Sequence, residues 1–238
     1  MINERASASR KRVTATVETA AAGGRETILR EAAKLFSSKG FAESGLREIA
    51  QMAGIRSSSV YHHFASKERI YEEIIRIAVD AIHASALREI AALPANPSPR
   101  QRIEAAIAGH LRALHSNKPF TSTNAQSRMK LPSDVDAVIR PVRDLYSGFW
   151  RKLLEDAARA GWLKPGLEPR MLRPLLLGTL NRSVGWFDAS QGPVDKLIHT
   201  TIETFSGIWS EPPTQAAPKP KPVIQKRTKA PAKKPRPQ

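Results

Sequence analysis

A run of short polar side chains and rings between residues 56 and 62 has the chemistry of a nucleic-acid reader. Serine hydroxyls are short enough to let a helix approach base edges in a major groove. A phenol and an imidazole suit hydrogen bonds to phosphate, which position a protein on DNA without reading its sequence. The expected DNA-binding residues are Arg56, Ser57, Ser58, Ser59, Tyr61 and His62, joined by Ser44 and Lys67 at the starts of neighbouring helices.

Other chemistries lack the residues that they need. The chain has no cysteine, which excludes disulfides, thiolate catalysis and zinc–sulfur sites. It also has no phosphate-cradling glycine loop, no Gly-x-Ser-x-Gly and no His-Glu-x-x-His. His62 and His63 are adjacent on an expected helix and so do not share a face, and His110 and His115 are five apart. We therefore expect no enzyme activity, no cofactor and no metal site.

The charge balance favours a polyanionic partner. Lys and Arg total 38 against 22 Asp and Glu, a formal charge of +16. Residues 212–238 contain eight basic residues, eight prolines and no acid, which predicts a disordered basic tail. Non-specific contact with phosphates is its simplest role, and a solubilising extension is the alternative.

No segment has the pattern of a signal peptide or a membrane span. The basic first residues are not followed by a long apolar run, and no stretch approaches the roughly 18 apolar residues that a span requires. We expect a soluble, cytoplasmic protein with no membrane partner.

The elements that must position the polar run are helices. After an expected disordered arm at 1–24, apolar residues recur at helical spacing until Gly40. A short helix is expected from Gly45 to Met52 with Ser44 as its N-cap, and another over 57–63 after a turn at Gly54. The inward residues of this unit, 25–72, are Leu46, Ile49, Ala50, Ile55, Val60 and Phe64. The alternative is a buried three-helix cluster whose polar face has no partner.

Residues 73–211 continue the helical pattern with no strand-like alternation. Ser66 is expected to cap a helix that runs to about Ala92, and a poorly defined stretch is expected after Pro119. Further helices are expected at 100–116, 133–160, 168–187 and 193–210. The fold class is therefore all-α, with a three-helix DNA-binding domain followed by a second helical domain.

The N-terminal unit resembles the TetR family of transcriptional regulators. The resemblance lies in Ser-Ser-Ser-Val-Tyr-His-His-Phe-Ala-Ser-Lys-Glu (57–68) and Ile-Leu-Arg-Glu-Ala-Ala-Lys-Leu-Phe-Ser-Ser-Lys-Gly-Phe (28–41). Family members often have glycine where this chain has Ser59, which affects the expected base contact. The resemblance implies a homodimer that binds a double-stranded operator and a second domain, residues 73–211, that binds ligand and dimerises.

The last two helices carry more apolar side chains than a monomer of this size readily buries. We therefore expect them to form a dimer interface, with a monomer core as the alternative. The apolar residues concerned are Leu172, Leu175, Leu176, Leu180, Val184, Ile198, Ile202, Phe205 and Trp209.

Residues 178–187 resemble a helix of TetR members that respond to acyl-CoA thioesters. Arg182 and Trp186 are four apart, and the resemblance implies that they bind the effector, with Phe149 and Trp150 of another helix nearby. The alternative is interface packing plus a surface arginine.

The function expected is repression relieved by a small molecule, such as an acyl-CoA thioester. An architectural DNA-binding protein driven by the basic tail is the rival.

Overall fold

The described part of this computed structural model comprises residues 24–126 and 131–210, and it is helical. A helix of residues 24–39 comes first. The others are α2 (Leu46–Met52), α3 (Ser57–His63), α4 (Lys67–Ala91), α5 (Pro99–Ser116), α6 (Lys118–Gln126), α7 (Ser133–Arg159), α8 (Pro169–Arg182) and α9 (Val194–Thr204), with 3-10 turns at Ser183–Gly185, Ala189–Gln191 and Ser206–Ile208. No strand occurs within these ranges, where one antiparallel bridge pairs Leu163 with Trp209.

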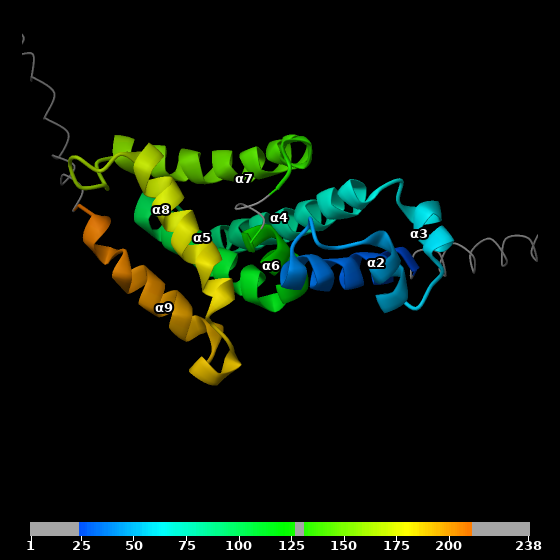
Figure 1. Ribbon diagram of the computed structural model, residues 1–238. Coiled ribbons are helices and arrows are strands. Elements are labelled where there is room, and N and C mark those ends of the chain that lie inside the picture. Colours follow the sequence, from blue (N-terminus) through cyan, green and yellow to red (C-terminus); the bar gives the residue numbers. More distant parts are fainter. Residues whose placement is uncertain (1–23, 127–130, 211–238) are drawn as a thin grey trace, which may run out of the picture.

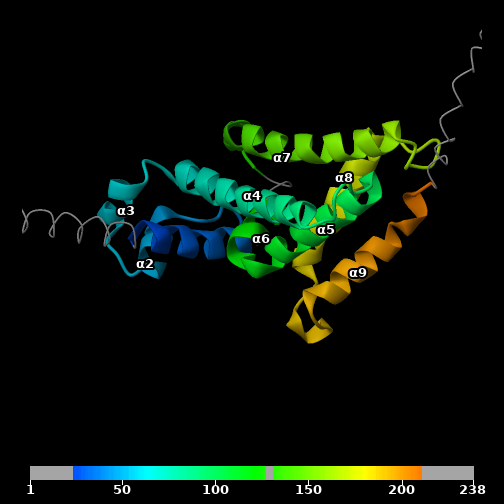
Figure 2. The same ribbon diagram turned by 180° about the vertical axis from the view of Figure 1, so that it is seen from behind.

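The helices form a small N-terminal unit and a larger body. Both views place the first helix, α2 and α3 at one end, with α4 leading from α3 into the body (Figures 1 and 2). In the body, α5 packs along α4 and α7 lies on one side, while α8 and α9 lie toward the other end. The described chain therefore ends on the side of the molecule opposite α3. The predicted arm (1–24) and tail (212–238) lie outside the described residues, except for Gly24, which begins the first helix.

Several helix ends form for the predicted reasons. Gly40 and Gly54 have φ angles of 87° and 68°, a conformation that glycine adopts without steric conflict. Ser66 caps α4, and its hydroxyl oxygen accepts a hydrogen bond from the Arg69 amide. The predicted cap at Ser44 is wrong, because the N-cap of α2 is Gly45 and no side chain bonds to that helix end.

Two other predicted boundaries differ from the structure. The stretch after Pro119 is a helix, because proline in a first helical turn has the right φ and needs no amide partner. The helix predicted to reach 187 ends at Arg182, where the chain tightens into a 3-10 turn. As a result, Trp186 lies beyond the helix on which it was expected.

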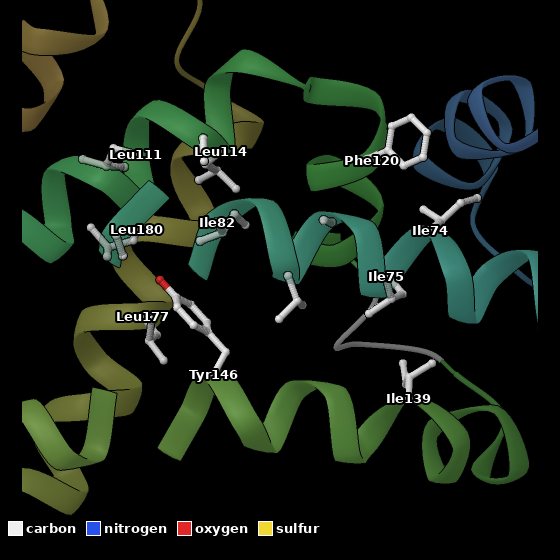
Figure 3. Close-up of a cluster of buried hydrophobic side chains, with 14 of the residues drawn as sticks. Ile74, Ile75, Ile82, Leu111, Leu114, Phe120, Ile139, Tyr146, Leu177 and Leu180 are labelled. Carbon is white, nitrogen blue, oxygen red and sulfur yellow. The ribbon is translucent and has the colours of Figure 1, made fainter. Parts of the chain in front are cut away.

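The body has a continuous apolar core built by α4, α5, α7 and α8. Figure 3 shows its centre, where isoleucines of α4 meet leucines of α5 and α8. Gly109 brings α5 against α4, since an added Cβ would lie 2.6 Å from the Ala86 Cα. Among the described helices, none is long and apolar enough to cross a membrane.

Candidate functional site

Helix α3 turns its apolar residues inward and its polar residues outward. Val60 and Phe64 are buried, while Tyr61 is 60% exposed. Arg56, Ser58 and His62 are also exposed, and Ser57 and Ser59 are half-buried. A face of short hydroxyls bordered by a cation, a phenol and an imidazole is thus presented to solvent at the tip of the molecule (Figure 1).

A groove beside Tyr61 extends this polar face. The start of α2, Tyr61 itself and the start of α4 line it. One lining residue, Arg47, is exposed, and neither it nor Arg56 has an ion-pair partner among the described residues. Two unpaired guanidinium groups beside exposed hydroxyls form a surface that suits a phosphate backbone. Sequence reasoning missed Arg47, although a cation in the first turn of α2 is a detectable signal.

Ser44 and Lys67 line this groove and also hold the unit together. The Ser44 hydroxyl is buried and donates to the Gly40 carbonyl oxygen at 2.7 Å. The Lys67 ammonium donates to the carbonyl oxygens of Phe41 at 2.9 Å and Ser44 at 3.0 Å, and it lies 4.2 Å from the centre of the Phe41 ring. Two of its three donors are therefore used internally. The geometry gives both residues a positioning role, and because both also line the groove beside Tyr61, the predicted DNA contact of each stays a prediction.

An ion pair and aromatic contacts hold the N-terminal unit against α4. Arg25 pairs with Glu73 of α4, and its guanidinium lies 4.8 Å from the centre of the Phe64 ring at the end of α3. Tyr71 of α4 meets Phe36 and Phe41 edge-on, with ring centres 5.3 and 4.9 Å apart. Movement of α4 would therefore carry α3 with it.

The four predicted ligand-binding residues do not line one buried pocket. Arg182 is exposed at the C-terminal end of α8, and Trp186 is 54% exposed beyond that end. On α7, Phe149 is half-buried and Trp150 is fully buried. The structure thus separates an outward pair at the end of α8 from an inward pair on α7.

A small cavity lies inside the body, and none of the four predicted residues lines it. Its volume is about 20 Å³, room for roughly one water molecule. Helices α4 to α8 all contribute to its wall, and α8 does so from the turn that also carries Arg182. The lining residues are Val79, Ile82, His110, Asn124, Arg143, Tyr146, Ser147, Leu177 and Asn181.

Tyr146 lines this cavity and contacts several of the residues around it. Its hydroxyl oxygen lies 2.9 Å from Nδ1 of His110, and Figure 3 shows the side chain directed from α7 toward the helices opposite. Burial raises the pKa of the Tyr146 hydroxyl, which therefore remains a neutral phenol. Phe149 stacks on the Tyr146 ring at 5.7 Å, and Trp150 meets it edge-on at 6.3 Å. The inward pair on α7 thus supports the cavity wall through Tyr146.

Most of the apolar residues predicted for a dimer interface are core residues of one chain. Leu172, Leu176 and Leu180 of α8 are buried, as are Ile198 and Trp209. Of the predicted residues only Leu175 is largely exposed, at 65%, beside Met171 at 61%. These two residues are one turn apart, so the exposed apolar surface of α8 is narrower than expected. The exposed face of α9 is polar.

Family comparisons cover both parts of the fold. A model described as bacterial regulatory proteins, tetR family, matches residues 28–74. A model of the tetracyclin repressor-like C-terminal domain matches residues 96–197. The first contains α2 and α3 with their exposed polar face, and the second contains most of the cavity.

Curated relatives extend the similarity over most of the chain. The HTH-type transcriptional repressor KstR2 of Mycobacterium tuberculosis (strain ATCC 25618 / H37Rv) is 28% identical over 166 residues, covering 68% of this chain and 80% of that protein. The biofilm operon regulator IcaR of Staphylococcus aureus (strain Newman) is 36% identical over 59 residues, 25% of this chain and 32% of its own length.

Solved structures share the fold. AibR, solved with isovaleryl coenzyme A and operator DNA, has a TM-score of 0.66 at 18% identity and covers 76% of this chain and 97% of its own. The ketosteroid regulator KstR2 of Mycobacterium tuberculosis has a TM-score of 0.62 at 24% identity and covers 79% of this chain and 95% of its own. PfmR of Thermus thermophilus has a TM-score of 0.61 at 26% identity and covers 74% of this chain and 94% of its own.

Proposed function

Because this chain belongs to the TetR family of bacterial regulatory proteins, we propose that it is a repressor that leaves its operator when a small molecule binds the body. The observation that carries this proposal is the outward polar face of α3, with Tyr61 exposed while Val60 beneath it is buried. Ser58 and Arg56 would meet the major groove, and Tyr61, His62 and Arg47 would meet phosphates. Such a protein works in the cytoplasm, where the chromosome lies.

A homodimer gives the polar face its sequence specificity. Two copies of α3 related by a two-fold axis read two half-sites of a palindrome about one DNA turn apart. Met171 and Leu175 are large, exposed and on one face of α8, so they would pack against a second copy. TetR-family relatives act as dimers, which supports this arrangement.

An acyl-CoA thioester is the effector class that we favour. AibR was solved with isovaleryl coenzyme A, and KstR2 is described as a ketosteroid regulator. In this chain, Arg182 and Trp186 are exposed at the end of α8 and would hold the phosphate and ring groups of coenzyme A. Asn181, next to Arg182, faces the cavity, which would take the acyl group.

Release of DNA follows from the size of the cavity. A space of about 20 Å³ cannot accept an acyl group unless the helices around it move apart. Val79 and Ile82 of α4 are part of its wall, so entry of the ligand displaces the helix that carries α3. Pro141 of α7 and Pro174 of α8 each remove a helical hydrogen bond, which makes these walls easier to bend. The effector therefore favours the conformer that does not fit the operator.

A footprint on DNA selected by the purified protein tests the DNA-binding proposal and its rival. We expect a discrete palindromic site that is protected by the full chain and by a variant lacking residues 212–238. An architectural protein driven by the basic tail would protect no discrete site and would lose binding with the tail. The affinity of the variant lacking residues 212–238 should also depend less steeply on salt, because each phosphate contact contributes about −0.9 to the slope of log affinity on log salt.

Arg182→Ala tests the effector proposal. The variant should bind the selected site with unchanged affinity but need a much higher concentration of acyl-CoA for release. Lys196→Ala removes another exposed cation, on α9, and serves as the control. Normal release of the Arg182→Ala variant would contradict the proposed effector contact.

A further inference from the structure

The cavity in the body has a wall that is mostly polar. Six of its nine lining residues have polar side chains, and none of the nine is Asp or Glu. We infer that the buried end of the effector carries an uncharged hydrogen-bond donor, a hydroxyl group, which donates to the side-chain oxygen of Asn181. This inference rests on the proposal that the body binds an effector, and it names the chemical group that the cavity selects.

Two of the larger polar groups on this wall already have partners within the chain. The hydroxyl oxygen of Tyr146 lies 2.9 Å from Nδ1 of His110. The guanidinium of Arg143 donates to the carboxylate of Asp136 at 3.1 Å and forms an ion pair with it. The arginine of the wall therefore has its counter-ion in the protein, and the cavity gives no reason to expect an anionic ligand group.

Asn181 differs from these groups. Its side-chain oxygen is buried and has no hydrogen-bond partner among the described residues. An amide oxygen only accepts, so it gains from a donor and gains nothing from a carboxylate or a ketone. A buried acceptor without a donor is unfavourable, and the cavity that Asn181 lines has room for roughly one water molecule. A hydroxyl group resembles that water, because it is small, uncharged and able to donate.

Two other kinds of ligand end fit this wall less well. A plain alkyl end would exclude water from Asn181 without replacing its hydrogen bond, and only three of the nine lining residues offer it apolar contact. An ammonium group would donate, but its positive charge would enter a wall that already contains Arg143. Because a buried acceptor left without a donor is costly, we expect a preference of about tenfold for a hydroxyl over the matching alkyl chain.

Octanoyl-CoA, 7-hydroxyoctanoyl-CoA and 7-oxooctanoyl-CoA form a matched set of probes. They have the same chain and differ at one carbon near its far end, which carries no oxygen, a hydroxyl or a ketone. Titration calorimetry on the full chain should give a dissociation constant about tenfold lower for the hydroxy compound than for either of the others, since a ketone accepts but does not donate. Equal affinity for all three, or tighter binding of the ketone or of octanoyl-CoA, would overturn the inference.

Variants assign the preference to the oxygen of Asn181. Asn181→Leu, which has a similar size and no acceptor, should bind the three thioesters with equal affinity, and Asn181→Ala replaces it if it does not fold. Asn181→Asp keeps oxygen acceptors and loses the amide donor, so it should retain the preference for the hydroxyl. Thr179→Val removes an exposed hydroxyl on the same helix and should behave as the native protein. Loss of the preference in Asn181→Asp, or its persistence in a folded variant with leucine or alanine, would contradict the inference.

Free octanoate and 7-hydroxyoctanoate separate this inference from the proposed effector class. Selective binding of 7-hydroxyoctanoate without binding of any thioester would support the hydroxyl contact and contradict the acyl-CoA proposal. Binding of all three thioesters with equal affinity, abolished by Arg182→Ala, would support the acyl-CoA proposal and overturn the inference. Absence of binding by all five probes would overturn both.

Discussion

The hydroxyl oxygen of Thr123, on α6, lies 3.0 Å from the main-chain carbonyl oxygen of Ala33, in the first helix. The same hydroxyl lies 2.9 Å from the Pro119 carbonyl oxygen of its own helix, so the two acceptors share its one hydrogen. The contact with Ala33 joins the body to the N-terminal unit independently of α4. The next residue, Asn124, lines the cavity. A ligand that moved α6 would therefore act on the first helix, so the cavity is connected to the N-terminal unit both through α4 and through Thr123.

Thr123→Val tests the second connection, because it keeps the shape of the side chain and removes the hydroxyl that contacts Ala33 and, within α6, Pro119. We expect unchanged operator affinity without effector and a several-fold higher effector concentration for half-release. The free energy of unfolding should fall by about 1 kcal/mol. Gel shifts with and without effector, together with urea unfolding, measure these quantities.

Thr121→Val is the matched control for that experiment. Thr121 is also buried on α6, but its hydroxyl donates within α5 and α6, to the Leu114 carbonyl oxygen at 2.6 Å. The Thr121→Val variant should be destabilised to a similar degree but should still release DNA at the normal effector concentration. An equal loss of response in both variants would show that stability, and not the contact with Ala33, controls release.

Removal of the exposed phenol on α3 should weaken DNA binding without unfolding the protein. Tyr61 is 60% exposed, so Tyr61→Ala leaves the core intact and deletes one phosphate contact. We expect operator affinity to fall by at least tenfold, the effect of losing a hydrogen bond to a charged group. Tyr61→Phe, which removes only the hydroxyl, should account for most of this loss. Unchanged affinity in the Tyr61→Ala variant would refute the phosphate contact.

A charge on the exposed face of α8 should prevent dimer formation. Sedimentation at micromolar concentration should show the native protein as a dimer and Leu175→Glu as a folded monomer, because the carboxylate would be buried between the subunits. Leu87→Glu changes a leucine of α4 that is also exposed, at 47%, and should remain dimeric. A monomeric native protein would remove the basis for reading a palindrome.

His115 should make the stability depend on pH below neutrality. Burial, with a smaller effect of Lys118, lowers the pKa of His115, whose Nε2 lies 2.9 Å from the Ser183 hydroxyl oxygen. The unfolded chain binds a proton near pH 6.5 and the folded chain does not. The stability that His115 contributes is thus present above about pH 6.5 and is lost as the pH falls through the folded-state pKa.

Melting temperatures between pH 7.5 and pH 5 measure this contribution. In His115→Gln, whose amide can still donate to Ser183, the melting temperature should fall less toward acid pH than in the native protein. His199→Gln replaces an exposed histidine of α9 and should match the native profile. An identical acid-side decline in all three proteins would contradict the role of His115.

Local signals made much of the fold predictable. Gly54 at the turn and Ser66 at the start of α4 act within a few residues of their own position, and the structure uses both as expected. The alternation of Val60 inward and Tyr61 outward also follows from helical spacing alone. The TetR resemblance of residues 25–72 was correct for the same reason, since that unit is defined by short-range spacing.

The parts that depend on distant contacts were not predictable. Lys67 is a cation at a helix start, but only the fold brings the carbonyl oxygens of Phe41 and Ser44 to its ammonium group. Leu176 and Leu175 are adjacent in the sequence, yet one is buried in the body and the other is exposed. The cavity is assembled from five helices, so no single stretch of sequence contains its pattern.

Docking of the polar face of α3 in a duplex groove can be tested at one position. The chain has no cysteine, so Ser58→Cys introduces a unique thiol to which a DNA-cleaving iron chelate can be attached. With DNA selected by the protein, we expect cleavage at two positions related by two-fold symmetry, about one helical turn or a multiple apart. Uniform cleavage, or the same cleavage pattern from a chelate placed on α4 by Ala81→Cys, would show that α3 does not enter the groove.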